Sequence, residues 1–174
     1  MIQQISQFDT LITNQLFSLI PHSSFFDLFF QTFSYIGGSM IVWVVLMFFL
    51  IIFEEIKKHV FILYFSLGNG LTWILTEIIL KNIFMRQRPM ITDICPTDFS
   101  LPSTHASTAF ASAVILSSFD KKRRYLYYLV ASLISYSRIY LGCHYFLDIV
   151  VGGLVGAVIA QIVLHIDISY RKKK

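Results

Sequence analysis

Three short segments of the chain hold ionisable side chains at spacings that suit chemistry on an anion. They are residues 81–89, 102–105 and 137–148. Lys81, Arg88 and Arg138 together could neutralise two or more negative charges, and arginine presents two parallel donors to phosphate oxygens. These cations therefore predict a phosphate-binding site.

The tetrapeptide Pro-Ser-Thr-His at residues 102–105 predicts the start of a helix. Ser103 is expected to cap this helix, which leaves the backbone N–H groups of Thr104 and His105 pointing outward. Phosphate binds at helix N-termini of this kind. The expected phosphate-binding residues are therefore Lys81, Arg88, Ser103, Thr104 and Arg138.

Two histidines accompany these cations. His144 and Asp148 lie four residues apart, so on a helix they share one face. A carboxylate so placed holds an imidazole in one tautomer and stabilises its cation, as in a catalytic triad. His105 is a second imidazole, and histidine titrates near neutral pH, which suits general acid catalysis. The pattern predicts a nucleophile beside the anion site.

The elements that must position these residues are strongly apolar. Of 174 residues, 56% are hydrophobic and 14% are charged, whereas a soluble domain usually carries about 25% charged residues. The composition excludes a disordered protein, disfavours a soluble enzyme and indicates a polytopic membrane protein with one domain, residues 1–174. Although the net charge is +4, no basic helix or RNA-binding signature is present, so we expect no nucleic acid partner.

Five apolar runs are candidates for membrane-spanning helices, which need about 20 residues. They are residues 33–53, 60–80, 104–119, 125–141 and 145–166. Gly152, Gly153 and Gly156 in the last run allow close packing between helices. We therefore expect an all-α bundle of about five transmembrane helices, with residues 33–170 carrying the site.

Residues 1–32 differ from these runs, because apolar residues recur there at helical spacing with polar residues, Asp9 and Thr13 among them, in between. This pattern predicts an amphipathic helix in the membrane surface. A proline should end it, and a second short interfacial helix should follow, capped by Ser23 or Ser24. One poorly hydrophobic extra span is the alternative.

The basic residues predict an orientation in the membrane. Ten of the 14 Lys and Arg residues fall in three clusters, at residues 57–58, 121–124 and 171–174. Such clusters usually lie on the cytoplasmic side of spans. One topology satisfies all three clusters, and it places the three candidate segments on the extracytoplasmic side. We expect the protein to lie in the plasma membrane of a bacterium. The sequence predicts no oligomeric state.

The three segments resemble the motifs of the type 2 phosphatidic acid phosphatase family, K-x6-RP, PSGH and SR-x5-H-x3-D. The first and third motifs match at Lys81, Arg88, Pro89, Ser137, Arg138, His144 and Asp148. The middle motif reads Pro-Ser-Thr-His, with Thr104 where the family has glycine. We expect Thr104 to contribute its backbone rather than its side chain. The match covers residues 81–148.

This resemblance implies a membrane lipid phosphatase that needs no metal or other cofactor. His144 would attack phosphorus and form a phosphohistidine, Asp148 would orient His144, and His105 would protonate the leaving oxygen and then activate water. The residues also favour this reading, since the set holds one carboxylate, too few for a two-metal site. The favoured substrate is a polyprenyl diphosphate such as undecaprenyl diphosphate; a phosphatidic acid, phosphatidylglycerophosphate or lipid A phosphatase and a lipid phosphotransferase are alternatives.

Four residues that the three motifs do not specify also carry predictions. Glu77 lies one turn before Lys81 and should pair with it. Arg86 either steers anionic lipid towards the mouth of the site or simply snorkels to the membrane surface, and we favour the second. Cys95 and Cys143 fall on the extracytoplasmic side, where a disulfide is permitted but not required.

The non-enzyme alternative is an anion transporter, with the three motif cations along an anion path. It is disfavoured because the cations gather on one face and the chain shows no repeated halves. The other histidines are expected to be packing residues: His22, His59 and His165.

Overall fold

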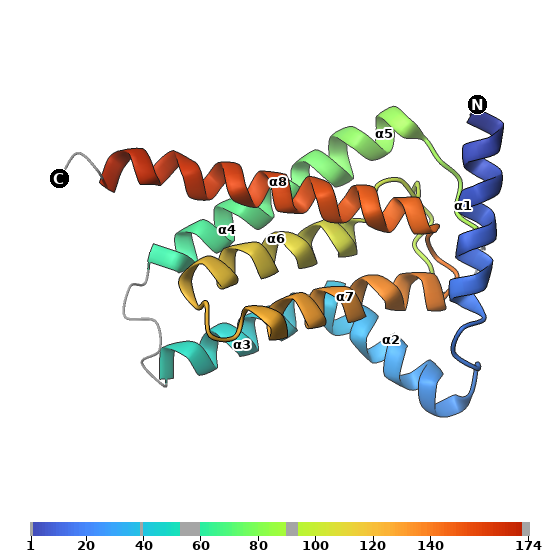
Figure 1. Cartoon of the computed structure of the whole chain (residues 1–174), viewed down its shortest axis with the longest axis horizontal. Helices are drawn as coiled ribbons and strands as arrows, with labels where there is room; N and C mark the ends of the chain where they lie inside the picture. Colours follow the sequence, from blue (N-terminus) through green and yellow to red (C-terminus); the bar gives the residue numbers. More distant parts are fainter. Residues whose placement is uncertain (1, 39, 53–59, 90–93, 172–174) are drawn as a thin grey trace.

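The described chain is all helical, as the sequence predicts (Figure 1). The computed structural model describes residues 2–38, 40–52, 60–89 and 94–171, and this part contains no strand. The helices are α1 (Ile2–Phe17), α2 (Ser24–Gly38), α3 (Ile41–Ile52), α4 (Val60–Trp73), the π-helix η1 (Ile74–Leu80), α5 (Lys81–Phe84), α6 (Thr104–Phe119), α7 (Arg124–Tyr140) and α8 (Phe146–Arg171).

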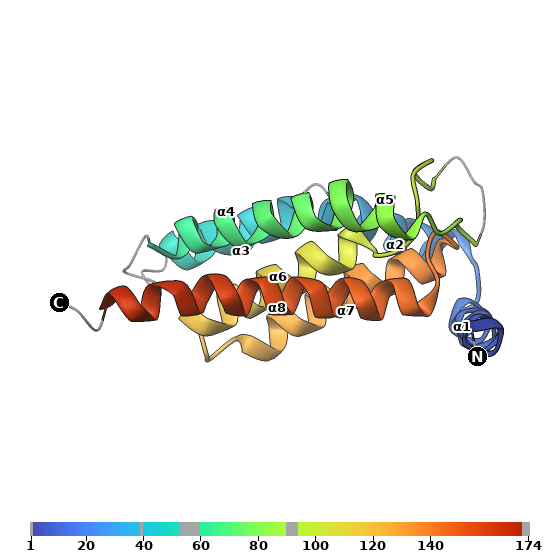
Figure 2. The same ribbon diagram turned by 90° about the horizontal axis from the view of Figure 1, so that it is seen from above.

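Helix α6 lies at the centre of the bundle and contacts α4, α7 and α8 (Figures 1 and 2). Its buried residues are mostly Ala, Ser and Thr, and small side chains let neighbouring helices approach closely. A Cβ added to Gly156 would lie 1.9 Å from the carbonyl oxygen of Ser107, and one added to Gly152 would lie 2.5 Å from that of Ser103. The close packing expected from these glycines is confirmed.

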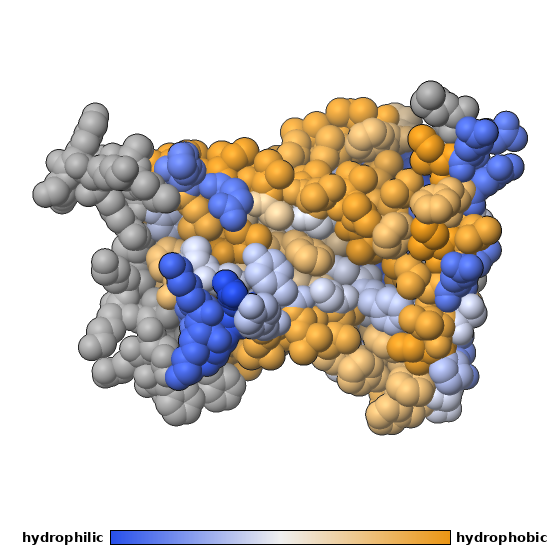
Figure 3. All heavy atoms as spheres, viewed as in Figure 1, coloured by the Kyte–Doolittle hydropathy of each residue, from blue (hydrophilic) through white to orange (hydrophobic). Residues whose placement is uncertain are grey.

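Apolar side chains fill the interior and also cover the outside of the bundle. Trp43, Phe61 and Ile115 are fully buried in the core, whereas Leu63 and Val158 are more than half exposed. The central part of the face in Figure 3 is mainly hydrophobic, and hydrophilic residues gather towards its two ends. An apolar surface of this extent indicates a lipid environment.

Two helical stretches are long and apolar enough to cross a membrane. They are Phe61–Phe84, which joins α4, η1 and α5, and Phe146–Ile166 in α8. Among the described residues, the bent pair of α2 and α3 raises the number to three if it is one broken span. The 16 residues of α6 and the 17 of α7 fall short of the usual crossing length of about 20 residues, so five spans stay a prediction.

The first expected span, residues 33–53, is not one helix. Helix α2 ends at Gly38 and α3 begins at Ile41, with 73° between their axes. Two consecutive glycines weaken a helix at this point, and Met40 takes a φ of 63°, outside the helical region. Helix α2 therefore continues to Gly38, beyond residue 33, where the sequence pattern placed the end of the second short helix.

Helix α1 lies crosswise at one end of the bundle (Figures 1 and 2). Ile5, Phe8 and Leu11 on it are more than half exposed, as an amphipathic helix in a membrane surface requires. Asp9 and Thr13, however, are buried rather than directed at water. The amphipathic pattern alone does not predict that part of the polar side faces the protein. The expected cap of α2 is present, because the hydroxyl of Ser23 accepts from the N–H of Phe26 at 3.5 Å.

The two ends of the bundle differ in character. The α6–α7 connection, with basic residues 121–124, lies at the end opposite α1, and α8 runs towards the same end (Figure 1). The loops between α5 and α6 and between α7 and α8 lie at the α1 end. Residues 57–58, His59 and residues 172–174 lie outside the described chain. The expected membrane orientation is thus still a prediction.

Candidate active site

The imidazole of His144 is held in the turn between α7 and α8. Helix α7 ends at Tyr140, and the φ of 71° at Gly142 lets the chain turn sharply. The backbone N–H groups of Cys143 and His144 donate to the carbonyl oxygen of Arg138 at 3.0 and 3.2 Å. His144 is thereby fixed next to the end of α7, and its side chain is almost fully buried.

The two ring nitrogens of His144 have different neighbours. Nη1 of Arg88 lies 2.9 Å from Nε2, and Oδ2 of Asp148 lies 3.5 Å from Nδ1. Because a guanidinium can only donate, Nε2 must accept and carry the lone pair, and the ring proton then lies on Nδ1 facing the carboxylate. This is the tautomer in which Nε2 is the nucleophilic atom.

The environment of His144 also sets its charge. Burial lowers its pKa to about 4, and Arg138 and Arg88 act in the same direction, while Asp148 opposes them. The imidazole is therefore neutral at pH 7, as a nucleophile must be.

Asp148 joins the segments of the site. Its Oδ2 accepts from the backbone N–H of Tyr145 at 2.9 Å, and its own carbonyl oxygen accepts from the N–H of Ser103 at 3.0 Å. The predicted helix start is present, because Ser103 caps α6 by accepting from the N–H of Ala106 at 3.5 Å. The N-terminus of α6 is in this way fixed against the first turn of α8.

The side chain of Thr104 makes a hydrogen bond within the site. Its hydroxyl donates to Oε2 of Glu77 at 2.5 Å, and the same oxygen accepts from Nζ of Lys81 at 2.8 Å. The predicted Glu77–Lys81 pair is confirmed. The bond from the Thr104 side chain is a contact that the sequence does not predict, and the role of its backbone in anion binding stays a prediction. Among the described residues, the non-glycine positions with positive φ are Met40 and Met85, so Thr104 is not strained by replacing glycine.

Lys81 occupies its position at the end of a π-helical segment. The N–H of Lys81 donates to the carbonyl oxygen of Thr76, five residues earlier, as a π-helix requires. Lys81 is only 4% exposed. Such segments occur often at functional sites, and the apolar run of the sequence gives no signal for this one.

Asp98 is a site residue that the sequence motifs do not include. One of its carboxylate oxygens contacts Nζ of Lys81, and the other lies 2.5 Å from Nη2 of Arg88. Burial acts to raise the pKa of Asp98, but the hydrogen bonds, from Lys81 first, outweigh it and hold the pKa well below the usual range. Asp98 thus pairs with two of the three cations that the sequence predicts to bind phosphate.

The site residues line two neighbouring cavities. Lys81, Arg88, His105 and His144 line one cavity of about 470 Å³. Arg138 lines the second, also of about 470 Å³, and His105 borders both. Thr104 also lines the first cavity, so the structure brings five of the predicted residues to it, whereas Arg138 lines the neighbouring cavity, with His105 bordering both.

Arg138 is almost fully buried, and it has unused donors. Its Nη1 donates to the hydroxyl of Ser34, whereas Nε and Nη2 are buried without a hydrogen-bond partner. Buried donors are nearly always paired in proteins. These two N–H groups could therefore serve oxygens of a bound anion.

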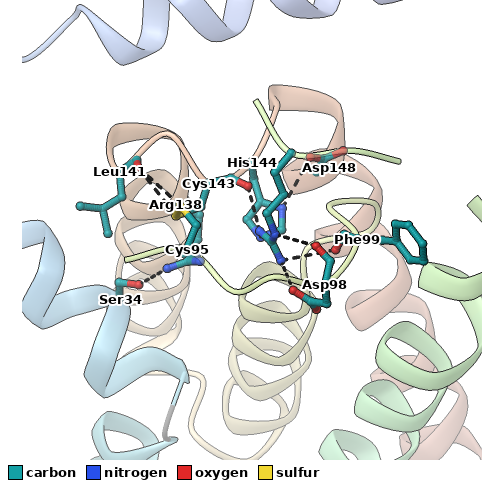
Figure 4. The surroundings of a disulfide bond; sticks show 10 residues. Ser34, Cys95, Asp98, Phe99, Arg138, Leu141, Cys143, His144 and Asp148 are labelled. Atoms are coloured by element: carbon teal, nitrogen blue, oxygen red, sulfur yellow. Dashed lines mark hydrogen bonds and ion pairs between the residues drawn. A yellow bond between two sulfur atoms is a disulfide. The ribbon is translucent and has the colours of Figure 1, made fainter. Parts of the chain in front are cut away.

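A disulfide joins the two loops of the site. Cys95 and Cys143 are bonded, with their Cα atoms 5.3 Å apart (Figure 4). This resolves the alternative that the sequence left open. The bond ties the loop that carries Asp98 to the residue preceding His144.

Arg86 does not simply snorkel to the membrane surface, so that expectation is wrong. Its guanidinium lies 2.8 Å from Oδ1 of Asp148 and 2.5 Å from Oδ2 of Asp9. The local sequence gives no signal for these contacts, since both partners are distant in the chain.

Among the described residues, no three His, Cys, Asp or Glu side chains are grouped to hold a metal ion.

Comparison with known protein families agrees with this set of site residues. The profile of the PAP2 superfamily matches residues 60–171, which contain all eight of the predicted site residues. The chain therefore belongs to the PAP2 superfamily. Its relatives place it in the branch of membrane lipid phosphatases within that superfamily.

Three relatives illustrate this likeness. An undecaprenyl-diphosphatase of Sulfolobus acidocaldarius is 30% identical over 145 residues, which cover 79% of this chain and 69% of the relative. The crystal structure of Aquifex aeolicus LpxE is 34% identical, with a TM-score of 0.64, and the match covers 87% of this chain and 92% of that one. A transmembrane PAP2 type phosphatidylglycerolphosphate phosphatase from Bacillus subtilis shares the fold, with a TM-score of 0.72, 22% identity and coverage of 95% and 87%.

Proposed function

We propose that this protein hydrolyses a phosphate ester or diphosphate on a membrane lipid through a phosphohistidine at His144, without a metal ion. One observation carries the proposal. Nε2 of His144 holds a lone pair, Nδ1 faces Asp148, and the imidazole borders the cavity that Lys81, Arg88 and His105 also line. A neutral nucleophile beside buried cations suits attack on a phosphate.

The reaction begins when a lipid phosphate replaces the carboxylate of Asp98 on Lys81 and Arg88. The released guanidinium uncovers Nε2 of His144, whose lone pair attacks phosphorus as the bond to the lipid oxygen breaks. His105 gives its proton to that oxygen, and Asp148 stabilises the imidazolium. His105 then takes a proton from water, and the water oxygen attacks phosphorus as the bond from phosphorus to Nε2 of His144 breaks. Inorganic phosphate leaves and the neutral imidazole is restored.

The remaining site residues stabilise the charge of the phosphate oxygens. The backbone N–H groups of Thr104 and His105 lie in the first turn of α6, whose N-terminus favours an anion. Arg138 offers its two unpaired donors. With these donors in place, arginine and lysine supply the charge neutralisation that a metal ion would otherwise give.

The substrate that we favour is a polyprenyl diphosphate such as undecaprenyl diphosphate. The relative from Sulfolobus acidocaldarius supports this choice through its name. Met40 and Trp73 border the same cavity as His144, so an apolar chain can lie next to the phosphate. The disulfide suits an oxidising compartment, and we place the site on the extracytoplasmic side of a bacterial plasma membrane, with α1 in the membrane surface.

Phosphate release by the purified full-length protein in detergent, with a metal chelator present, tests the proposal. Undecaprenyl diphosphate, phosphatidic acid, phosphatidylglycerophosphate and lipid A are compared, with His144→Ala as the matched control. We expect release that persists with chelator, is fastest for undecaprenyl diphosphate and disappears in the variant. Release that continues in His144→Ala would refute the nucleophile, and transfer of phosphate to an added alcohol would indicate a phosphotransferase.

A further inference from the structure

Helix α1 reaches the active-site end of the bundle through two buried polar side chains. Oδ1 of Asp9 accepts from the backbone N–H of Leu147 at 2.9 Å, and the hydroxyl of Thr13 accepts from the N–H of Phe146 at 2.9 Å. These N–H groups belong to the first turn of α8, where the helix has no acceptors of its own. Helix α1 therefore caps the helix whose first turn also carries Asp148.

Arg86 connects this cap to the active site. Its Nη2 lies 2.5 Å from Oδ2 of Asp9, and its Nη1 lies 2.8 Å from Oδ1 of Asp148. The guanidinium also stacks over the ring of Tyr145, 3.9 Å from the ring centre. Both carboxylates are fully buried, where a charge must be paired. One cation is therefore shared between two carboxylates.

The charges around His144 explain why it matters that Arg86 is shared between Asp9 and Asp148. Arg88 lies at Nε2, and Arg138 lies close by on α7, so both disfavour a positive imidazole. His105 on α6 is the other titratable group near it. Among the described residues, Asp148 is the anion that faces the ring. Its charge must therefore hold Nδ1–H and stabilise the cation that forms when Nε2 is phosphorylated.

We propose that Asp9 and Arg86 are positioning residues for the nucleophile, acting through Asp148. Arg86 fixes the carboxylate of Asp148, and Asp9 takes part of the charge of Arg86, so that Asp148 stays available to His144. The inference deepens the proposed function and rests on it for the role of His144. It assigns to the N-terminal helix a part in the chemistry as well as in membrane contact.

Asp9→Asn tests the proposal, because asparagine retains an oxygen for the N–H of Leu147 and loses the charge. Thr13→Val is the matched control, since it removes the other cap from α1 and leaves the ion pairs intact. We measure kcat and KM for phosphate release, and we titrate His144 by NMR of ¹⁵N-labelled histidine in the full-length protein.

We expect Asp9→Asn to lower kcat about tenfold, the equivalent of one pKa unit, with KM little changed. The midpoint of the His144 titration should move to lower pH, since Arg86 then neutralises Asp148 more completely. Thr13→Val should retain both values. Unchanged kcat and titration in Asp9→Asn, or equal losses in both variants, would overturn the inference.

A double variant keeps the proposal testable if Asp9→Asn does not fold. Arg86→Gln leaves two buried carboxylates without their shared cation, whereas Asp9→Asn/Arg86→Gln removes one charge of each sign. We expect the double variant to have the higher kcat, and the opposite order would refute the coupling. If the wild type releases no phosphate, the proposed function fails, while the NMR titration of Asp9→Asn still decides whether Asp9 acts on His144.

Discussion

His144 lies among cations, and the proposed mechanism requires it to be neutral before the attack and positive once phosphorus is bound. Burial first, and then Arg138 and Arg88, lower its pKa to about 4. The free imidazole therefore keeps the lone pair on Nε2 at physiological pH. In the mechanism that we propose, Asp148 and the negative phosphate supply the opposite charge when the phosphohistidine forms.

The first prediction concerns pH. We expect kcat/KM to show no loss of activity from protonation of His144 between about pH 5 and 7, because this group gains its proton only as the pH falls through about 4. Rates for a lipid diphosphate, corrected for the ionisation of the substrate, check this. An acid limb at the ordinary value of 6.5 that matches the NMR titration of His144 would contradict it.

The same shift has a consequence for stability. His144 takes up a proton near its ordinary pKa of 6.5 in the unfolded chain but only near about 4 in the folded one. Its neutral form therefore favours the fold fully above pH 6.5, and this contribution is lost as the pH falls from 6.5 to about 4.

Some side-chain pairs of the site could be predicted from spacing alone. His144–Asp148 and Glu77–Lys81 each lie four residues apart, and helical geometry brings such residues together. The partners of Arg86 are 62 and 77 residues away, so no local pattern indicates them. Asp98 was missed for a similar reason, because it lies in a loop outside the three motifs.

Among the helices, the pair α6 and α8 forms the tightest contact on which the site depends. Gly152 and Gly156 face the backbone of Ser103 and Ser107, and backbone atoms cannot move aside as a flexible side chain can. The packing therefore also fixes the cap of α6 relative to Asp148, since the N–H of Ser103 donates to the carbonyl oxygen of that residue.

The second prediction is that Gly156→Ala destabilises the protein by about 1–3 kcal/mol through overpacking, because its Cβ would lie 1.9 Å from the oxygen of Ser107. Thermal unfolding in detergent measures the change. Gly70→Ala is the matched control, since no atom lies within 4 Å of the added Cβ, and alanine favours a helix by up to about 1 kcal/mol over glycine. Equal melting temperatures for the two variants would contradict the argument.

The helices differ in how well their bounds could be predicted. Residues 104–119 were expected as one helix and form α6, because a long apolar run with a capping serine is a strong local signal. The break between α2 and α3 was missed, although Gly37 and Gly38 occur there. A Cβ at Gly37 would lie 2.6 Å from the side chain of Ile134, so the course of the chain there depends on tertiary contacts.

For the molecule as a whole, one end of the bundle holds the site and is tied together by several links. The disulfide closes a stretch of 48 residues between the α5–α6 loop and the α7–α8 turn, and α1 caps α8 at the same end. The opposite end carries the basic α6–α7 connection (Figure 1). The links that stabilise this end therefore also fix the geometry of the candidate site.

The third prediction concerns this link. Replacing both cysteines, Cys95→Ser/Cys143→Ser, should destabilise the fold by about 4 kcal/mol, the loop-closure value for a crosslink of this span. Thermal unfolding with and without reductant measures the effect, and alkylation followed by mass spectrometry confirms the oxidation state. The reduced wild type should melt with the double variant, and reductant should not affect the variant. A wild type that melts at the same temperature in both conditions would refute the prediction.

The π-helical turn before Lys81 has a consequence for how this chain is compared with others. A π-turn holds one residue more than the α-helical turn that it replaces, and one residue corresponds to about 100° of rotation around a helix. An alignment with a protein that lacks the turn therefore needs a one-residue gap within Ile74–Leu80. Without that gap, every position of α4 would be displaced by about 100° around the helix axis, so that some lipid-facing residues would be read as core residues.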